Sequence, residues 1–262
     1  MSTDQNQYYV LAVKRSIQLL NLYANHGPGI GISDIAKLMD IHKSVVHKLL
    51  VTMASEGWVY QDPSDSKYYL GLQLLKLSQA VPERFAFRKI ARQIMDNLVA
   101  EADETATLTV LDSNFGYGIC IELVECSHSV RLVSQIGREI PLHAGASGLI
   151  MAAHMPSDKI EQLLLSELKC YTPHTITNPL LLRMELDKIK VQGYALTEGQ
   201  VDYGLVAVAA PILNARGELI AGLNISGPNY RFESIEKKRH LISLVQKYAH
   251  LISEAIIYSG DY

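Results

Sequence analysis

The sequence predicts an α+β protein with an N-terminal winged helix-turn-helix, a helical linker, and a C-terminal domain built on an antiparallel sheet flanked by helices. Three observations carry this prediction. Two short helical patterns are separated by a tight turn, two short aromatic strands follow directly, and most later strand-like runs can be joined by hairpins. At 262 residues the chain is long enough for two domains with separate cores.

The first expected element is a helix at about residues 10–25, in which Val13, Ile17 and Leu20 share one apolar face. Arg15 lies off that face, where its guanidinium can meet a backbone phosphate. The glycine-rich stretch 27–31 is interpreted as a loop. It has an internal proline, it lacks the third glycine of a dinucleotide fingerprint, and no strand precedes it.

The helix-turn-helix itself is expected to begin at Ser33, which is interpreted as an N-cap ahead of the favourably placed Asp34. After a turn at residues 40–42, the second helix starts near Lys43 and stops at Gly57. Its helical spacing predicts four buried positions, namely Val46, Leu49, Leu50 and Met53.

The opposite face of this second helix is short, polar and cationic, because residues three and four apart share one stripe. Such a face meets base edges in the major groove, and Val45 at its margin can touch a thymine methyl. Strands at 58–61 and 67–70, joined by the turn 62–66, would form the wing. The residues expected to contact double-stranded DNA are Arg15, Ser33, Lys43, Ser44, Val45, His47, Lys48 and Lys67.

A plain helical hairpin with a solvated polar face is the alternative interpretation of this region. The order of the elements is more specific than the charges, because residues 1–80 hold seven Lys and Arg against six Asp and Glu. Non-specific nucleic-acid binders depend on neutralising many phosphates. The nearly balanced charge therefore favours a small sequence-specific reader.

Composition excludes several other classes of protein. The net charge is −3, no apolar run is long enough to span a membrane, and the N-terminus lacks a signal-peptide core, so a cytoplasmic protein without a membrane partner is expected. Three cysteines without CxxC spacing argue against a disulfide framework or a cysteine-rich zinc site. Histidine pairs of the HxxxH or HExxH kind are missing, so no metal or other cofactor is expected.

The predicted domains are 8–72 for DNA binding, 73–103 for the linker helices, and 104–258 for the C-terminal domain. The linker helices are expected to be interrupted at Val81-Pro82. A glycine-rich loop at 141–148 leads into a helix, and further helices are expected after residue 157, at 180–192 and at 234–257. The strands are expected at residues 105–112, 117–125, 129–136, 194–197, 205–213 and 219–226.

Six motifs give the chain a family resemblance over about residues 8–258. They are KSVVHKLL (43–50), EGWVYQD (56–62), YYLGLQLLKL (68–77), PLHAGASG (141–148), EGQVDYGLVAVAAPI (198–212) and GLNISGP (222–228). With these motifs the chain resembles the IclR family of bacterial transcription regulators. It departs from the family pattern at Val45, where Thr is usual, at Lys48, where Arg is usual, and at Asn224, where Ser is common. Lys cannot make the two-pronged contact of Arg, so the operator sequence is expected to differ.

The resemblance implies a C-terminal effector domain with a sheet similar to GAF or PAS modules. The glycine-rich loop and the ends of the last two long strands would wall a pocket for a small carboxylate or aromatic-acid effector. The residues expected to bind this effector are Gly145, Ala146, Ser147, Thr197, Asp202, Ala207, Asn224 and Ser226.

The residues themselves support such a pocket. A glycine-rich loop that runs into a helix presents free N–H groups and a positive dipole end, which favours a carboxylate. Asn224 and Ser226 alternate on one strand and can face one ligand together. In the alternative interpretation, Gly145 and Gly148 only permit a tight turn. Arg131 and His128 are either extra anchors or side chains with a solvated or structural role.

The expected function is a ligand-responsive transcription regulator, with repression the commoner behaviour in the resembled family. A homodimer on a pseudo-palindromic operator is expected because one reader of this size buries little DNA surface, and the resemblance adds a homotetramer. A hydrolase is disfavoured because Ser147 is not in a G-x-S-x-G elbow, and Glu198 and Asp202 lack a nucleophile and base. The residues also leave open a ligand-free interaction protein, and a catalytic or storage protein that merely carries a helix-turn-helix.

Overall fold

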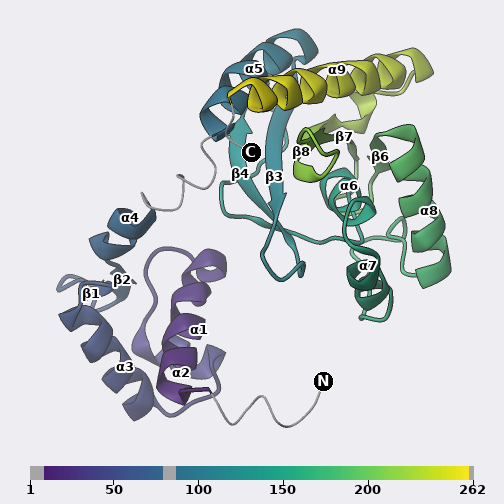
Figure 1. The fold of residues 1–262 in the computed structure, drawn as a ribbon. Helices are drawn as coiled ribbons and strands as arrows, with labels where there is room; N and C mark the ends of the chain where they lie inside the picture. The colour runs from purple at the N-terminus through teal and green to yellow at the C-terminus, as the bar shows by residue number, and fades with distance from the viewer. Residues whose placement is uncertain (1–8, 79–86, 260–262) are drawn as a thin grey trace. The chain divides into compact units, whose positions relative to one another are not determined.

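The computed structural model describes residues 9–78 and 87–259 (Figure 1). The chain divides into two compact units between residues 85 and 86, and each unit is described by itself. The predicted helix interruption at Val81-Pro82 lies outside the described residues. Within those residues, no helix combines the length and the apolar character that crossing a membrane requires.

The N-terminal unit is a winged helix-turn-helix, as the sequence predicts. The strands β1 and β2 pair antiparallel, with Val59 opposite Leu70, and Ile30 exchanges two backbone hydrogen bonds of 3.0 Å with Tyr68. The turn between α2 and α3 includes Asp40 at φ 50°. In chain order the elements are α1 (Leu11–His26), α2 (Ile32–Leu38), α3 (Lys43–Ser55), β1 (Val59–Gln61), β2 (Tyr68–Leu70) and α4 (Leu72–Ser78).

The core of this unit forms between α1, α2, α3 and the wing. The prediction of four buried positions in α3 is confirmed, since Val46, Leu49, Leu50 and Met53 are all buried. Tyr23 of α1 is also buried, and its hydroxyl donates to the Tyr68 carbonyl at 3.0 Å, which ties α1 to β2. Burial, with a smaller contribution from Tyr68, raises the pKa of Tyr23 to about 12.

The interpretation of Ser33 as an N-cap is wrong. The helix α2 begins at Ile32, one residue before Ser33, and its N-cap is Gly31 in an extended conformation. The Gly31 carbonyl accepts the first hydrogen bonds, from Asp34 N and Ile35 N at 3.0 Å. An N-cap has non-helical dihedral angles, so Ser33, which is already inside the helix, cannot serve as one.

Of the apolar face predicted for α1, only Leu20 packs against the core, and the prediction is wrong for Val13 and Ile17. Val13 and Ile17 are 55% and 54% exposed, whereas Leu19 and Tyr23 are buried. Helical spacing identifies an apolar stripe but not what covers it. The N-terminal half of α1 therefore carries an uncovered apolar surface.

The C-terminal unit is built on one six-stranded sheet in the order β5-β4-β3-β8-β7-β6. All the described neighbouring strands pair antiparallel, which confirms the predicted sheet. The strands are β3 (Thr105–Leu111), β4 (Gly118–Val124), β5 (Glu139–Ile140), β6 (Ala195–Glu198), β7 (Leu205–Leu213) and β8 (Leu219–Pro228).

Helices cover both faces of this sheet. Figure 1 shows α5 (Phe87–Ala102) and α9 (Ile235–Ser259) together on one side and α6 (Ala146–Ala153) on the other. The remaining helices are α7 (Ser157–Leu164) and α8 (Pro179–Gln192), and a short 3-10 turn, Asn229–Arg231, precedes α9. The bounds of α8 follow from its caps, because the Asn178 side chain accepts from two backbone amides and Gly193 adopts a left-handed conformation.

The predicted strand at 129–136 is wrong. This segment is irregular, and only the two residues of β5 pair with β4 beyond it. Val130, Val133 and Ile136 are exposed, so their β-branched side chains do not mark a buried strand face. The edge of β4 is met instead by the following turn, in which Gly137 N donates to the Cys120 carbonyl at 2.7 Å.

Candidate nucleic-acid interface and ligand cavity

The exposed side of α3 gathers four of the predicted DNA contacts. Lys43, Ser44, His47 and Lys48 are exposed, and we call these four residues the reading face; Val45 at its margin is partly buried. His42 is the N-cap of α3, with its Nδ1 3.3 Å from the Ser44 amide and 2.8 Å from the Ser44 hydroxyl. His42 thus orients Ser44, a role that sequence reasoning missed.

The wing is ordered by two aspartates. Asp62 Oδ1 accepts from the Ser64 amide at 2.8 Å and from its hydroxyl at 2.6 Å. Asp65 accepts from the Lys67 amide at 2.9 Å and from the Tyr69 hydroxyl at 2.8 Å. These hydrogen bonds hold the turn and leave the Lys67 side chain exposed after it.

The other two predicted DNA contacts lie outside α3 and the wing. Arg15 is a half-buried residue of α1, and Ser33 is a half-buried residue in the first turn of α2. The structure therefore brings only four of the eight predicted contacts together on one face, with Val45 at its margin.

A cavity of about 100 Å³ lies in the C-terminal unit, between one face of the sheet and the loops at 140–147 and 199–202. Strand register places its sheet residues side by side, because Ala207 pairs with both Ser226 and Thr197, and Thr107 pairs with Asn224. All eight residues predicted to bind an effector line this cavity: Gly145, Ala146, Ser147, Thr197, Asp202, Ala207, Asn224 and Ser226.

The backbone conformation and close packing around the start of α6 require glycine at two positions. Gly145 adopts φ +76°, and a Cβ on Gly148 would lie 1.8 Å from the Pro141 carbonyl oxygen. The tight-turn interpretation of these glycines therefore holds. It is compatible with an anion site, because α6 starts at Ala146 without a side-chain cap and its N-terminus borders the cavity.

Asn224 organises the polar part of the cavity. Its Nδ2 donates to Thr107 Oγ1 at 3.2 Å and to Ser226 Oγ at 3.3 Å. Thr107 was not predicted, although its register opposite Asn224 would have identified it once the strand pairing was known. Gln200 was also missed, and its side-chain oxygen accepts from the Gly145 amide at 3.1 Å.

Two charged side chains border the cavity. Arg138 Nη2 lies 3.9 Å from Asp202 Oδ2, and both residues line the cavity. Arg138 was not predicted, because it follows the segment that was wrongly assigned to a strand. The two suggested anchors do not line this cavity, since Arg131 pairs with Glu125 at 3.2 Å and His128 with Asp103 at 3.0 Å.

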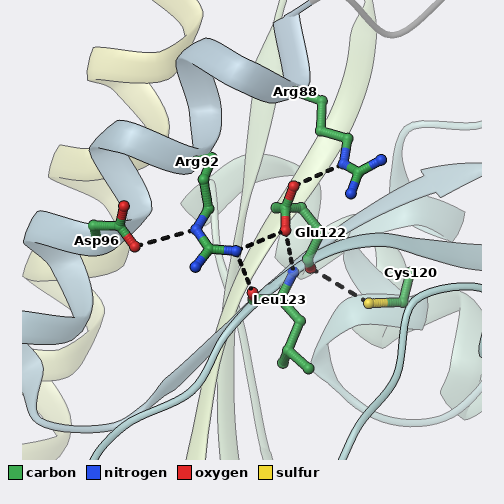
Figure 2. Close-up of polar contacts among 6 residues, drawn as sticks. All are labelled: Arg88, Arg92, Asp96, Cys120, Glu122 and Leu123. Carbon is green, nitrogen blue, oxygen red and sulfur yellow. Dashed lines mark hydrogen bonds and ion pairs between the residues drawn. The ribbon is translucent and has the colours of Figure 1, made fainter. Parts of the chain in front are cut away.

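A buried carboxylate joins the first helix of this unit to the sheet (Figure 2). Glu122 of β4 accepts from Arg88 Nε at 2.7 Å and from Arg92 Nη1 at 3.1 Å, both on α5. Burial raises the pKa of Glu122, but hydrogen bonds from Arg88, the Leu123 amide and Arg92 outweigh it and hold this pKa below its usual value. Two residues earlier on β4, Cys120 N donates to the carbonyl of Arg138, which lines the cavity.

Comparison with known proteins decides the family. A model of the IclR helix-turn-helix domain matches residues 12–63, and a model of the bacterial transcriptional regulator IclR C-terminal domain matches residues 79–254. The chain belongs to the IclR family. Among curated IclR-family relatives, the HTH-type transcriptional regulator KipR of Bacillus subtilis is 33% identical over 94% of this chain and 97% of its own length. The transcriptional repressor IclR of Escherichia coli is 28% identical over 84% of this chain and 80% of its own.

Solved structures agree with this IclR-family assignment. Thermotoga maritima IclR superposes with a TM-score of 0.73 at 29% identity, covering 95% of this chain and 100% of that one. An IclR homolog from Microbacterium hydrocarbonoxydans, complexed with 4-hydroxybenzoate, has a TM-score of 0.81 at 22% identity, covering 95% and 99%. The latter shows a shared fold. IclR-family members are transcription regulators rather than enzymes, with a DNA-binding N-terminal domain and an effector-binding C-terminal domain.

Proposed function

We propose that this protein is a transcriptional repressor whose binding to a pseudo-palindromic operator is modulated by a small organic acid in the C-terminal cavity. The observation that carries the proposal is the cavity itself, in which a helix N-terminus, a guanidinium and a set of buried hydroxyl and amide groups converge. A regulator of transcription acts where the DNA lies, so we place it in the bacterial cytoplasm.

On the DNA side, the reading face of α3 enters the major groove, and Lys67 on the wing contacts the backbone or minor groove. Lys48 is a cation of this face and lies one turn into the helix, where base edges are usually met. Its single ammonium donates to an acceptor on a base or a phosphate, without the two-pronged geometry of Arg. We also propose that Arg15 and Ser33 contact the DNA backbone and are less important for binding than the reading face.

A homodimer is proposed because a lone reader of this size rarely binds tightly. Support comes from the uncovered apolar surface at the start of α1, which includes Tyr9, Val10, Val13 and Ile17. Covering this surface with the same surface of a second copy removes it from water and places two readers on one DNA. Pairing of two dimers gives the tetramer that we propose as the larger assembly.

On the ligand side, the carboxylate is proposed to bind where the N-terminus of α6 and Arg138 border the cavity. The homolog from Microbacterium hydrocarbonoxydans, complexed with 4-hydroxybenzoate, supports an acid as ligand. Ligand binding changes DNA binding only if the ligand has different affinities for two arrangements of the protein. We propose residues 73–103 as the connection, with the contacts of Glu122 coupling α5 to β4.

The test is a selection of bound fragments from random DNA by the purified full-length protein. We expect enrichment of a pseudo-palindromic site that survives competition by non-specific DNA at physiological salt. A protein that merely carries a helix-turn-helix would instead show weak, strongly salt-dependent binding with no enriched site. That result would overturn the proposed function.

A further inference from the structure

The N-cap of α3 determines where one proton of the reading face lies. The backbone amide of Ser44 donates to His42 Nδ1 at 3.3 Å, and a backbone N–H can only donate. His42 Nδ1 therefore offers a lone pair and carries no proton. The imidazole is neutral in this arrangement, with its ring proton on Nε2.

The hydroxyl of Ser44 donates to the same ring nitrogen. Ser44 Oγ lies 2.8 Å from His42 Nδ1, which is a hydrogen-bond distance. Because Nδ1 has no proton to give, the proton in this contact belongs to Ser44. A serine hydroxyl has one proton and two lone pairs, so its proton points back to the helix cap and its lone pairs are left over. Ser44 thus offers DNA an acceptor and no donor.

The place of Ser44 in α3 brings this acceptor to the bases. Ser44 is exposed and is the second residue of the helix, and the N-terminal residues of a recognition helix contact base edges. Lys43 precedes it, and Lys48 lies about one turn further on the same face. A lysine ammonium donates and cannot accept. The reading face therefore sets a fixed acceptor beside fixed donors.

The chemistry of the major groove decides what a fixed acceptor selects. Adenine presents its N6 amino group there and cytosine its N4 amino group, whereas guanine N7 and O6 and thymine O4 are acceptors. Phosphate oxygens are acceptors as well, so Ser44 has no proton for the DNA backbone while His42 holds it. The hydrogen bond to His42 spans only two residues and exists before DNA arrives, and it becomes stronger where DNA displaces water.

We propose that Ser44 reads the exocyclic amino group of an adenine or cytosine, and that His42 sets this preference by holding the Ser44 proton. Ser44 is then a specificity-determining residue, and His42 is a positioning residue that acts through it. This inference rests on the proposed function and names the base chemistry that the reading face recognises.

The hydrogen bond is tested first, in the full-length protein without DNA. Proton–nitrogen correlation NMR on protein with labelled histidine distinguishes the two neutral tautomers of each ring at pH 8. The signals of His42 are those missing from the His42→Gly variant. We expect the tautomer with its proton on Nε2. A proton on Nδ1 overturns the inference, because that nitrogen could not accept from Ser44.

The base preference is tested on an operator selected from random DNA. Each adenine is replaced in turn by purine, which lacks the N6 amino group, and each cytosine by 2-pyrimidinone, which lacks the N4 amino group. Fluorescence anisotropy at fixed salt measures the affinities of the natural protein and of Ser44→Ala. At one position in each half-site we expect the lost amino group to weaken the natural protein about tenfold, with little further effect on Ser44→Ala.

Controls on the DNA distinguish an acceptor from a donor at Ser44. Guanines are replaced by 7-deazaguanine, which lacks the N7 acceptor, and single phosphates by methylphosphonate, which lacks the charged oxygen. Each of these changes is expected to weaken the natural protein and Ser44→Ala by equal factors. A change that weakens only the natural protein would mean that Ser44 donates to that group, and it would overturn the inference.

Two further variants assign the preference to the His42 contact. His42→Gly removes the acceptor, and glycine is tolerated as an N-cap. The tenfold effect of the lost amino group is expected to fall to about threefold or less, whereas a merely structural role would weaken all operators equally. Thr52→Ala is the matched control. Its exposed hydroxyl donates to the Lys48 carbonyl near the other end of α3, and the variant is expected to keep the tenfold effect.

The outcomes separate this inference from the proposed function. An enriched operator on which Ser44 couples to no amino group, or a preference that survives His42→Gly, overturns the inference and leaves a sequence-specific regulator intact. Failure to enrich any operator overturns the proposed function and the base preference together.

Discussion

Arg88 Nε donates to Glu122 Oε2 across 2.7 Å, and this contact fixes the beginning of α5 to the sheet (Figure 2). Arg92 joins the same carboxylate from one turn further along α5 and also donates to the Leu123 carbonyl at 3.0 Å. A single buried carboxylate thus holds two guanidinium groups of the helix that begins the C-terminal unit.

Replacing this carboxylate should destabilise the C-terminal unit in a pH-dependent way. Glu122→Gln is expected to lower the free energy of unfolding by about 1–3 kcal/mol at pH 7, because two guanidinium groups lose their buried partner. The folded-state pKa of Glu122 is depressed, so this contribution is present above pH 4.5 and is lost as pH falls through the folded value. Denaturation followed by circular dichroism should therefore show the difference from the natural protein shrinking below pH 4.5.

Asp96→Asn is the matched control for that experiment. Asp96 pairs with Arg92 Nε at 3.2 Å but is exposed, and exposed pairs contribute about 0–1 kcal/mol. An equal loss of stability in the two variants, or a Glu122→Gln effect that is the same at pH 7 and pH 3, would contradict the role given to Glu122.

The hydroxyl of Tyr23 provides a separate test of the N-terminal unit. Tyr23→Phe is expected to cost about 1 kcal/mol, because the Tyr68 carbonyl keeps its other donor, the Ile30 amide. Since the folded pKa is raised to about 12, the unfolded tyrosine ionises first, so this contribution is full below pH 10 and fades as pH rises toward 12. Trp58 is the only tryptophan of the chain, so its fluorescence during denaturation reports on this unit. No difference between the two proteins at pH 8 would argue against this contact.

Lys48→Ala tests the reading face. Loss of a cation that contacts the groove should weaken operator affinity about tenfold at fixed salt. Lys190→Ala removes an exposed lysine of α8 in the other unit and should leave the affinity unchanged. The fluorescence anisotropy of a labelled operator measures the affinity of each variant. Equal affinities for the two variants would show that Lys48 does not contact the DNA.

Ile17→Glu tests the proposed dimer. A carboxylate in the uncovered surface of α1 would be buried on association, so the dimer should dissociate and operator affinity should fall with it. Val191→Glu changes an exposed apolar residue of α8 and is the control. Analytical ultracentrifugation should show a monomer for the first variant only, and an unchanged mass for Ile17→Glu would place the dimer contact elsewhere.

Ser226→Ala tests the sheet side of the cavity. The variant removes one acceptor of the Asn224 amide, so the response of operator binding to the acid should weaken while DNA binding without the acid persists. Ser166→Ala, on the exposed hydroxyl after α7, is the control. Loss of DNA binding in Ser226→Ala without any acid would mean that Ser226 is structural.

Local patterns predicted much of this fold for a physical reason. The four buried positions of α3 follow from helical periodicity alone, and the long strand β7 is a continuous apolar run that ends at a turn. Local patterns failed where tertiary packing determines which side chains are buried and whether a segment forms a strand. The apolar stripe of α1 faces outward at Val13 and Ile17, and the β-branched residues of 129–136 lie in an irregular, exposed segment.

The cavity was predicted only in part for the same reason. Its glycine-rich loop and the Asn224–Ser226 alternation are visible in short stretches of sequence. Thr107 and Asn224 are 117 positions apart, and Gly145 and Gln200 are 55 apart, so their pairing depends on strand register and loop closure that no local pattern encodes.

The most direct test of the central claim measures operator affinity at fixed salt with and without the acid that binds the cavity. We predict that saturating acid changes the operator dissociation constant about fivefold or more, and that saturating operator changes the acid's dissociation constant by the same factor, because binding linkage is reciprocal. An acid that binds with full occupancy while the operator dissociation constant stays the same would contradict the claim that the cavity controls DNA binding.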